Sequence, residues 1–422
     1  MYKKKILDSG LKIIAHSMPA RQSLALGIWL KTGGRYESKL NKGISHFLEH
    51  LLFKGSRKYS CRSIKESIEG VGGSLNGFTS EELTCYLVKI PSRYLNLAFD
   101  ILADMVVNPA LLEEEVEKER TVILEEIKMY RDLPQAYVYE LLDELLWPLQ
   151  ALGSPVAGTL DSVSSITRDD IAAYQRQFYT PANTVISVAG CFDYAKLKKR
   201  VLKIFSSRKS GVPNVYIPAQ ETQDGAQARI FNKDTEQSHL ALGFHSLARE
   251  HSLKHALGLL HVILGANMSS RLFNEVREKR GLAYEIGTQV QRFQDTGAFI
   301  VHAGIDNRKV TDALGLILKE LEVIKSNLVT PDEFRRAKEF YLGQLMLALE
   351  DTLDHMLWIG ESTVAVDKAY SLNDIIKEVN RVTREDIRAA AKQIFKSGKL
   401  NLSLIGPLAK SEKAIKETIG IS

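Results

Sequence analysis

Residues 45–53 read SHFLEHLLF, so two histidines and an acid stand within one of the most apolar stretches of the chain. In a helix, His46 and His50 lie one turn apart on the same face, and Glu49 lies on a neighbouring line. Ser45 is the candidate N-cap, and the flanking Phe and Leu residues predict that the helix is largely buried. Two imidazoles and a carboxylate buried without partners would be costly, and one metal ion satisfies all three. The stretch therefore predicts a metal-binding helix.

The order H-x-x-E-H is a zinc-hydrolase signature, the inverse of H-E-x-x-H. A five-residue pattern also recurs by chance, and the alternative is a pair of core histidines that hydrogen-bond to the backbone. A catalytic zinc site needs three protein ligands and an open position for water. A third ligand therefore decides between the two interpretations.

Residues 112–130 predict a long helix that carries this third ligand. Glu119 and Glu126 project beside one apolar stripe, and two acids on a buried face imply a positive partner such as the metal. We assign Glu126 as the ligand and Glu119 as the acid that orients a ligating histidine. Helical periodicity alone leaves the opposite assignment nearly as good. The stripe comprises Val116, Ile123, Ile127 and Tyr130.

Further motifs follow in a fixed order. HFLEH is followed by Glu126 within EKERTVILEEIKMYRD, residues 72–87 read GGSLNGFTSEELTCYL, and VREKRGLAY places Arg277 and Tyr284 seven residues apart. Over essentially the whole chain, these motifs resemble the zinc endopeptidase family of pitrilysin, insulin-degrading enzyme and mitochondrial processing peptidase. The chain looks most like the short bacterial members that are similar to the β subunit of the mitochondrial enzyme.

The resemblance implies a role for each matching residue. It implies Glu126 as the metal ligand with Glu119 as its companion, and Arg277 and Tyr284 as the pair that binds the substrate carbonyl. Residues 72–87 correspond to the family's substrate-binding edge strand, with Gly77 where alanine is more usual. The substrate-binding residues implied there are Asn76, Gly77, Thr79 and Glu82.

These residues predict a zinc endopeptidase with one Zn²⁺ per chain. We expect zinc held by His46, His50 and Glu126 to lower the pKa of its bound water from 15.7 to about 7, and Glu49 to act as general base. An extended peptide would add as a strand beside residues 74–80. One alternative is a noncatalytic partner or scaffold subunit of a processing-peptidase-like complex. Another is a metal-dependent hydrolase of non-peptide substrates.

The resemblance also bears on assembly. In the family, two such two-domain units face each other around a closed chamber, and the Arg/Tyr pair that serves a zinc lies in the opposite unit. This chain is one unit that carries both elements. We therefore expect a homodimer in which Arg277 and Tyr284 act in trans, with a heterodimer as the alternative.

Length and composition set the remaining expectations. A chain of 422 residues fits two domains of about 200, and 45% apolar with 25% charged residues is ordinary for a soluble protein. A net charge of +5 without a basic cluster among aromatics predicts no nucleic-acid partner, and no apolar run is long enough for a membrane span. The three scattered cysteines, Cys61, Cys85 and Cys191, favour a reducing cytoplasm.

An internal repeat defines the expected domains. Leu24-Ala25-Leu26-Gly27 recurs 216 residues later at Leu240, and Thr167-Arg168-Asp169-Asp170 recurs in similar form at Thr383. We predict a zinc-binding domain at 1–208, a linker at 209–227, and a homologous domain at 228–422 that carries the Arg/Tyr pair. The predicted fold class is α+β, with each domain a β-sheet covered on one face by α-helices.

The repeat offers an internal control. At the same spacing, His46, Glu49 and His50 correspond to Val262, Gly265 and Ala266, and the counterparts of Glu119 and Glu126 are Arg335 and Leu342. The fold therefore does not need the metal-site residues, which favours a catalytic role for them in the first half.

Overall fold

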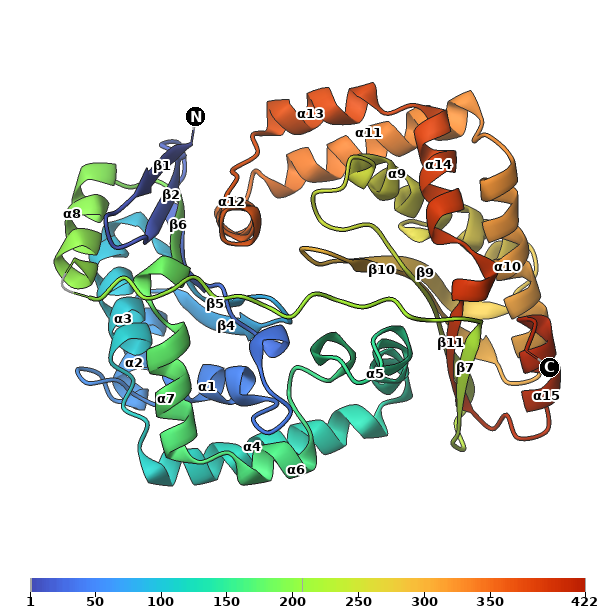
Figure 1. Ribbon diagram of the computed structural model, residues 1–422. Coiled ribbons are helices and arrows are strands. Elements are labelled where there is room, and N and C mark those ends of the chain that lie inside the picture. Colours follow the sequence, from blue (N-terminus) through green and yellow to red (C-terminus); the bar gives the residue numbers. More distant parts are fainter. Residues whose placement is uncertain (1, 207, 422) are drawn as a thin grey trace. The chain divides into compact units, whose positions relative to one another are not determined.

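The computed structural model describes residues 2–206 and 208–421 and divides into two compact units (Figure 1). The first unit comprises Met1–Lys128, Pro155–Ile217 and Leu345–Leu372, and the second comprises Met129–Ser154, Pro218–Gln344 and Asn373–Ser422. The chain passes between them within α4 (Glu113–Asp132) and α11 (Pro331–Ala348) and at the start of α13 (Leu372–Arg381). It also passes between them at Ser154–Pro155 and at Ile217–Pro218, outside these helices.

The first unit is a six-stranded sheet with its helices. Its strands are β1 (Lys3–Ile6), β2 (Lys12–Ser17), β3 (Ser23–Leu30), β4 (Ser74–Thr79), β5 (Thr84–Pro91) and β6 (Thr184–Gly190). Its helices, apart from α4, are α1 (Ile44–Leu52), α2 (Cys61–Glu69), α3 (Leu95–Val107), α6 (Leu160–Ser165), α7 (Arg168–Phe178), α8 (Tyr194–Phe205) and α12 (Thr352–Val366).

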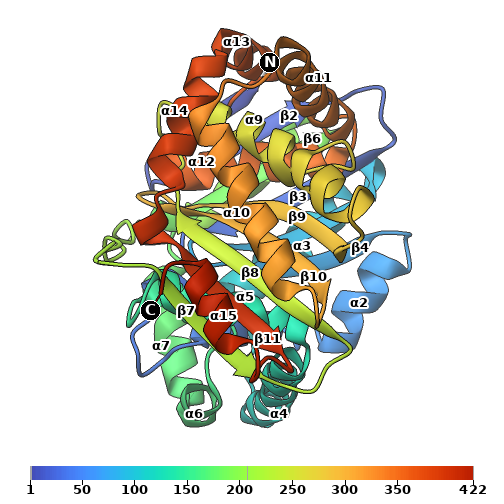
Figure 2. The same cartoon turned by 90° about the vertical axis from the view of Figure 1, so that its right-hand side faces the viewer.

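The second unit contains a five-stranded sheet. Its strands are β7 (Gln227–Asn232), β8 (Gln237–His245), β9 (Ala283–Arg292), β10 (Gly297–Asp306) and β11 (Asn401–Gly406). Its helices, apart from α11 and α13, are α5 (Pro134–Leu146), α9 (Lys254–Gly265), α10 (Val310–Ser326), α14 (Arg384–Ile394) and α15 (Glu412–Thr418). Figure 2 shows α10, α14 and α15 lying over one face of this sheet.

The two sheets are connected in the same way. The strand order is β1-β2-β6-β3-β5-β4 in the first sheet and β7-β11-β8-β10-β9 in the second. The pairs β2–β6 and β7–β11 are parallel, and all the other pairs are antiparallel. Apart from β1, each strand of the first sheet therefore has a counterpart in the second, as the repeat predicts. The predicted α+β fold class with two homologous domains is confirmed.

The prediction that helices cover each sheet on one face was wrong for the first sheet, because strand β3 is covered on both faces. Leu24, Leu26 and Ile28 are fully buried with residues of α1, α3 and α7, and the alternate residues Ala25 and Trp29 are buried with residues of α12. Side chains of a strand point alternately to the two faces, so β3 lacks the polar positions of a strand with one face in water.

The packing of α12 on the first sheet is close. A Cβ added at Gly360 would lie 2.1 Å from Nε1 of Trp29, and that indole nitrogen donates a hydrogen bond of 2.8 Å to Oγ of Ser187. Only glycine therefore fits where α12 crosses the indole. In the second unit, α5 packs on β8 and β11 through residues such as Leu141 and Leu142.

Each unit thus takes one helix from the other half of the sequence. Helix α5 comes from the first half and packs in the second unit, while α12 comes from the second half and packs in the first. The predicted domains at 1–208 and 228–422, with the linker at 209–227, follow the two sequence repeats. The compact units do not follow the repeats, because they exchange a helix, so these bounds stay a prediction about the repeats. Among the described residues, none of the helices is both long and apolar enough to cross a membrane.

Candidate metal centre and active site

Helix α1 separates its buried side chains from its polar ones. Ile44, Phe47 and Leu48 are fully buried, while His46, Glu49 and His50 are only partly buried on the other side. The apolar face fixes the helix in the core of the first unit, so the polar triplet is presented on the opposite side of the helix.

The start of α1 differs from the expectation. The N-cap is Gly43, which has a φ of 93°, and the predicted cap Ser45 lies inside the first turn. A Cβ at Gly43 would lie 2.6 Å from the carbonyl oxygen of Ala157, so both the backbone conformation and the space require glycine. The prediction for Ser45 was wrong because a preference for serine at N-caps carries no information about the approach of a distant loop.

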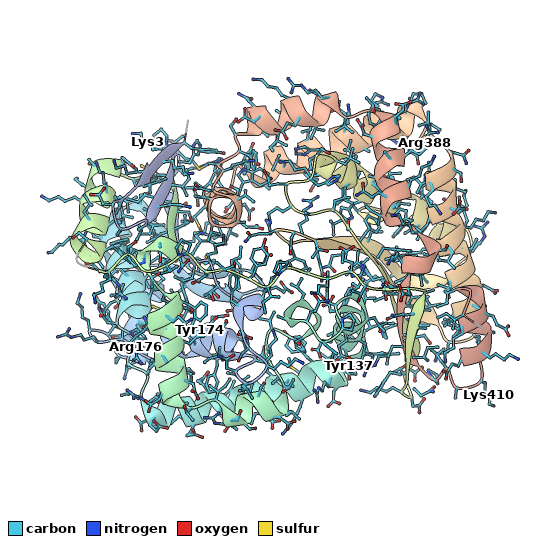
Figure 3. The ribbon with its side chains drawn as sticks, viewed as in Figure 1. Lys3, Tyr137, Tyr174, Arg176, Arg388 and Lys410 are labelled. Atoms are coloured by element: carbon cyan, nitrogen blue, oxygen red, sulfur yellow. The ribbon has the colours of Figure 1, made fainter. Side chains whose placement is uncertain are left out.

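The capping acceptor comes instead from Glu37, which the sequence did not reveal. Its two carboxylate oxygens accept hydrogen bonds of 2.8 Å from the backbone N–H groups of Gly43 and Ser45. The side chain of Glu37 is fully buried, the ammonium of Lys42 lies 3.6 Å away, and burial raises the pKa of the carboxyl. On the same turn, the Ser45 hydroxyl shares a hydrogen bond of 2.7 Å with Tyr174 of α7, which is labelled in Figure 3. The first turn of α1 is therefore held by partners outside the helix.

Three side chains of the first unit converge. Nε2 of His46 lies 3.9 Å, and Nε2 of His50 lies 3.6 Å, from the same oxygen, Oε2 of Glu126 on α4. One ligand atom from each residue lies within 4.8 Å of the others, the only such group of three or more His, Cys, Asp or Glu residues in the described part of the chain. Ligands at about 2 Å in a tetrahedral zinc site are about 3.3 Å apart, so the two distances to Oε2 of Glu126, 3.9 and 3.6 Å, are close to those that a bound zinc requires.

The chemistry of this set fits a divalent metal. Burial, reinforced by the neighbouring His50, lowers the pKa of His46 to about 4, so its imidazole is neutral at pH 7. A neutral imidazole offers a lone pair to a metal but makes no ion pair with Glu126. All three side chains retain partial exposure, which leaves room for a further ligand. Two histidines and one carboxylate with an open position are typical of catalytic zinc.

Glu119 lies two turns before Glu126 on the same side of α4 and contacts His50. Its Oε2 lies 3.1 Å from Nδ1 of His50, and its Oε1 forms an ion pair with Lys54. The acid is buried, while Lys54 remains partly exposed. Glu119 therefore contacts the ring nitrogen of His50 that faces away from Glu126, as expected for an acid that orients a ligating histidine. Lys54, which balances the charge of Glu119, is a member of the site that the sequence patterns did not indicate.

Glu49 points toward the edge strand β4. Its Oε2 accepts a hydrogen bond of 2.6 Å from the hydroxyl of Thr79. Burial raises the pKa of Glu49, and the hydrogen bond from Thr79 partly opposes this effect. A carboxylate whose pKa is raised toward neutrality is a better general base than one in open solvent.

The four residues expected to bind substrate lie in different surroundings. Asn76 is exposed on β4, and its Oδ1 accepts a hydrogen bond of 2.8 Å from the N–H of Gly77. Thr79 faces Glu49. Glu82 lies beyond the end of β4, where it is buried and forms an ion pair of 2.6 Å with Arg35. The strand itself is the last in its sheet, so one of its edges pairs with no other described strand.

Arg277 and Tyr284 lie together in the second unit. Arg277 belongs to a π-helical segment, Phe273–Glu278, and Tyr284 to the start of β9. The guanidinium carbon is 5.5 Å from the centre of the Tyr284 ring, and the Tyr284 side chain is 73% exposed. The two side chains therefore form one exposed pair of hydrogen-bond donors.

The sequence of this chain matches known protein families and known relatives. Residues 12–160 match the insulinase family (peptidase family M16), and residues 165–341 match the peptidase M16 inactive domain. An uncharacterized zinc protease of Streptomyces coelicolor is 38% identical, with 96% of this chain and 90% of the relative covered. Uncharacterized zinc protease YmxG of Bacillus subtilis is 37% identical, with 96% and 98% covered.

Solved structures show the same fold. A protease from Helicobacter pylori has a TM-score of 0.92 at 24% identity, with 96% of this chain and 99% of the other covered. A peptidase M16 inactive domain from Pseudomonas fluorescens has a TM-score of 0.88 at 18% identity, with 96% and 98% covered. The resemblance inferred from the sequence motifs is thus confirmed: the chain belongs to the insulinase (M16) family of peptidases.

Proposed function

We propose that this protein is a zinc-dependent endopeptidase whose active centre is formed by α1, α4 and β4. The observation that carries the proposal is the convergence of His46, His50 and Glu126 within 4.8 Å, with the carboxylate of Glu49 on the same helix. Membership of a peptidase family, with relatives named zinc proteases, supports hydrolysis of peptide bonds over other metal-dependent hydrolysis.

In this proposal, each residue of the centre has one task. His46, His50 and Glu126 hold one Zn²⁺, which supplies the Lewis acidity that lets a water molecule lose a proton at neutral pH. Glu49 accepts that proton and then delivers it to the leaving amine of the cleaved bond. Glu119 keeps the ring of His50 in one orientation, and Lys54 balances the charge of Glu119.

We propose that the substrate binds in extended form along the open edge of β4. Main-chain hydrogen bonds along a strand give affinity with little demand on side chains. The exposed side chains of Asn76 and Phe78 and the lack of a side chain at Gly77 support this use of the strand. The burial of Glu82 with Arg35 gives Glu82 a supporting role at the end of β4 rather than direct contact with substrate.

We further propose a homodimer that encloses the substrate in a chamber, in which the Arg277 and Tyr284 pair of one subunit donates hydrogen bonds to the substrate carbonyl at the centre of its partner. The exposure of Tyr284 and its closeness to Arg277 support a role of this pair toward another molecule. Mixing Glu49→Gln subunits with Tyr284→Phe subunits tests the arrangement, because a mixed dimer regains one intact site. Proven subunit exchange without recovery of activity would contradict it.

The test of the function itself uses the purified full-length protein. Elemental analysis is expected to find one zinc per chain, and quenched fluorescent peptides are expected to be cleaved. A chelator should abolish cleavage, and added Zn²⁺ should restore it. Zinc-loaded protein that cleaves none of a diverse peptide library would favour a noncatalytic subunit instead. The cytoplasmic location stays a prediction from the scattered cysteines.

A further inference from the structure

The side chain of Thr79 makes an unusual contact for a residue on a strand expected to bind peptide. Its Oγ1 donates to Oε2 of Glu49 over 2.6 Å, which is short and typical of a hydrogen bond to a charged acceptor. Among the described residues, Thr79 is the only hydrogen-bond donor to the Glu49 side chain. The other oxygen, Oε1, accepts no hydrogen bond from them. One oxygen of the acid is therefore fixed while the other is available.

The strand is built to let this contact form. In β4, Leu75, Gly77 and Thr79 share one side, and β4 packs against α1. A Cβ at Gly77 would lie 3.0 Å from the ring of Phe53, the residue that follows α1, which is tighter than ordinary contact. A glycine two residues before Thr79 thus lets the strand approach the end of α1 closely, and Thr79 reaches Glu49 from the same side.

The Thr79 hydroxyl can donate only one hydrogen bond, which limits its contacts with a substrate. A threonine hydroxyl has one hydrogen to donate, and here Glu49 accepts it. Thr79 can therefore not donate to a bound peptide without releasing the acid. This separates Thr79 from Asn76, whose exposed side chain has no such contact with the centre.

The second unit contains a similar contact without an acid. There, Nδ1 of His261 on α9 lies 2.7 Å from Oγ1 of Thr288 on the edge strand β9. A hydrogen bond from helix to edge strand therefore also occurs where the repeat lacks Glu49. The alternative is that the bond between Thr79 and Glu49 only holds the strand to the helix, and the contact of Thr288 allows a test of this alternative. Thr288 is a matched control within the same chain.

We propose that Thr79 is a positioning residue that holds the Glu49 carboxylate in the orientation needed to accept a proton, rather than a residue that binds substrate. The inference rests on the proposed peptidase function. Loss of the hydroxyl leaves Glu49 present but free to rotate, so proton transfer slows while peptide binding along β4 is unchanged.

The experiment compares Thr79→Val, which removes the hydroxyl and preserves the shape, with Thr79→Ser and Thr288→Val in the full-length zinc-loaded protein. We expect kcat of Thr79→Val to fall roughly 10- to 100-fold with KM within about twofold of wild type. Thr79→Ser should recover most of kcat, and Thr288→Val should match wild type. Zinc content and Tm measured for each variant show whether the site and the fold are intact.

A second readout does not depend on turnover. In a Glu49→Gln background, the affinity for an uncleaved peptide is measured by fluorescence anisotropy with and without Thr79→Val. Equal affinities are expected. An affinity loss of tenfold or more, or a rise in KM with kcat unchanged, would identify Thr79 as a substrate contact and overturn the proposal. So would an equal fall in kcat for Thr288→Val.

The two proposals fail in different ways. If wild-type protein with one bound zinc cleaves no peptide, the peptidase function fails and the role of Thr79 fails with it. If wild-type protein is active and Thr79→Val is equally active, only the role of Thr79 is overturned.

Discussion

Helices α1 and α9 lie in units whose sheets have the same strand connections, yet only α1 carries a candidate metal centre. Each helix packs against the edge strand of its sheet, β4 for α1 and β9 for α9. At the repeat spacing, the metal-site histidines of α1 correspond to Val262 and Ala266, and α9 is apolar there. The architecture therefore forms with or without the polar triplet, so the fold does not require the triplet.

The starts of the two helices show the same contrast. The N-cap of α9 is Leu253, which makes no side-chain cap, whereas the start of α1 is held by the buried carboxylate of Glu37. At the repeat spacing, Leu253 is also the counterpart of Glu37. Because α9 forms without such an acid, the burial of Glu37 is better explained by the need to fix the direction of α1 and its histidines.

The largest effect is expected when α4 is made to resemble α11, which has Leu342 in place of Glu126 at the repeat spacing. We expect Glu126→Gln to lower zinc affinity by more than 100-fold and to abolish cleavage, since one of three ligands is lost. Competition with a colorimetric chelator measures the affinity. The control is Glu125→Gln, which changes an exposed acid paired with Lys128, and which should bind zinc as wild type does. Equal affinity of the two variants would contradict the ligand assignment.

Two helical glycines allow a second comparison, one in the exchanged helix α12 and one in α11. At Gly360 of α12, an added Cβ would meet the Trp29 ring at 2.1 Å, whereas at Gly343 of α11 it would meet nothing within 4 Å. We expect Gly360→Ala to lower the free energy of unfolding by about 2–3 kcal/mol through overpacking. Gly343→Ala should raise it by about 0.5–1 kcal/mol through helix propensity. Urea denaturation measures the free energy of unfolding of both variants. A Gly360→Ala protein as stable as wild type would show that α12 is not closely packed on the sheet.

Removing the charge of Glu37 should make the start of α1 resemble that of α9. In Glu37→Gln, an amide NH₂ faces one of the two backbone N–H donors, so one capping bond is lost. We expect zinc affinity to fall by about tenfold. Asp193→Asn, which alters the carboxylate cap of α8 away from the metal centre, should leave zinc affinity unchanged. A similar loss in both variants would indicate a general effect on stability.

The smallest expected effect concerns pH and the contact of α12 with β2. The ring of His16 stacks on His355 of α12 with ring centres 4.2 Å apart, and burial, followed by the effect of His355, lowers the pKa of His16 to about 4. Between this value and the unfolded pKa of about 6.5, the unfolded chain binds more protons, so stability is lost as the pH falls through that range.

The variant His16→Phe removes this titrating group and preserves an aromatic ring. We expect wild-type protein to lose about 1 kcal/mol more than the variant between pH 7 and pH 4.5, after allowance for the partial exposure of His16. Urea denaturation at the two pH values gives the difference. Parallel loss in both proteins would show that His16 does not contribute.

Local patterns predicted much of the fold and the centre. The periodicity of residues 112–130 indicated the helix observed at Glu113–Asp132, and the repeat spacing places α14 216 residues after α7. Tyr130 is an exception, because it is 40% exposed although the helical wheel placed it on the buried stripe. It lies beyond Lys128, where the chain leaves the first unit, so the apolar surface that buries the stripe ends before it.

The features that escaped prediction are all long-range. Glu37, Lys54 and the buried pairing of Glu82 with Arg35 depend on which loops meet, and side-chain spacing within one element does not reveal this. The exchange of α5 and α12 is of the same kind, since it depends on which sheet each helix meets, and the pattern within one helix does not reveal this.

We propose that the polar triplet of α1 converts a shared architecture into a peptidase. The most direct measurement is the turnover of a quenched peptide by wild-type and Glu49→Gln proteins, each shown by elemental analysis to hold one zinc. We predict chelator-sensitive turnover for the wild type and a fall of roughly 1,000-fold or more for the variant at unchanged zinc content. Equal turnover of the two zinc-loaded proteins would show that Glu49 is not the general base.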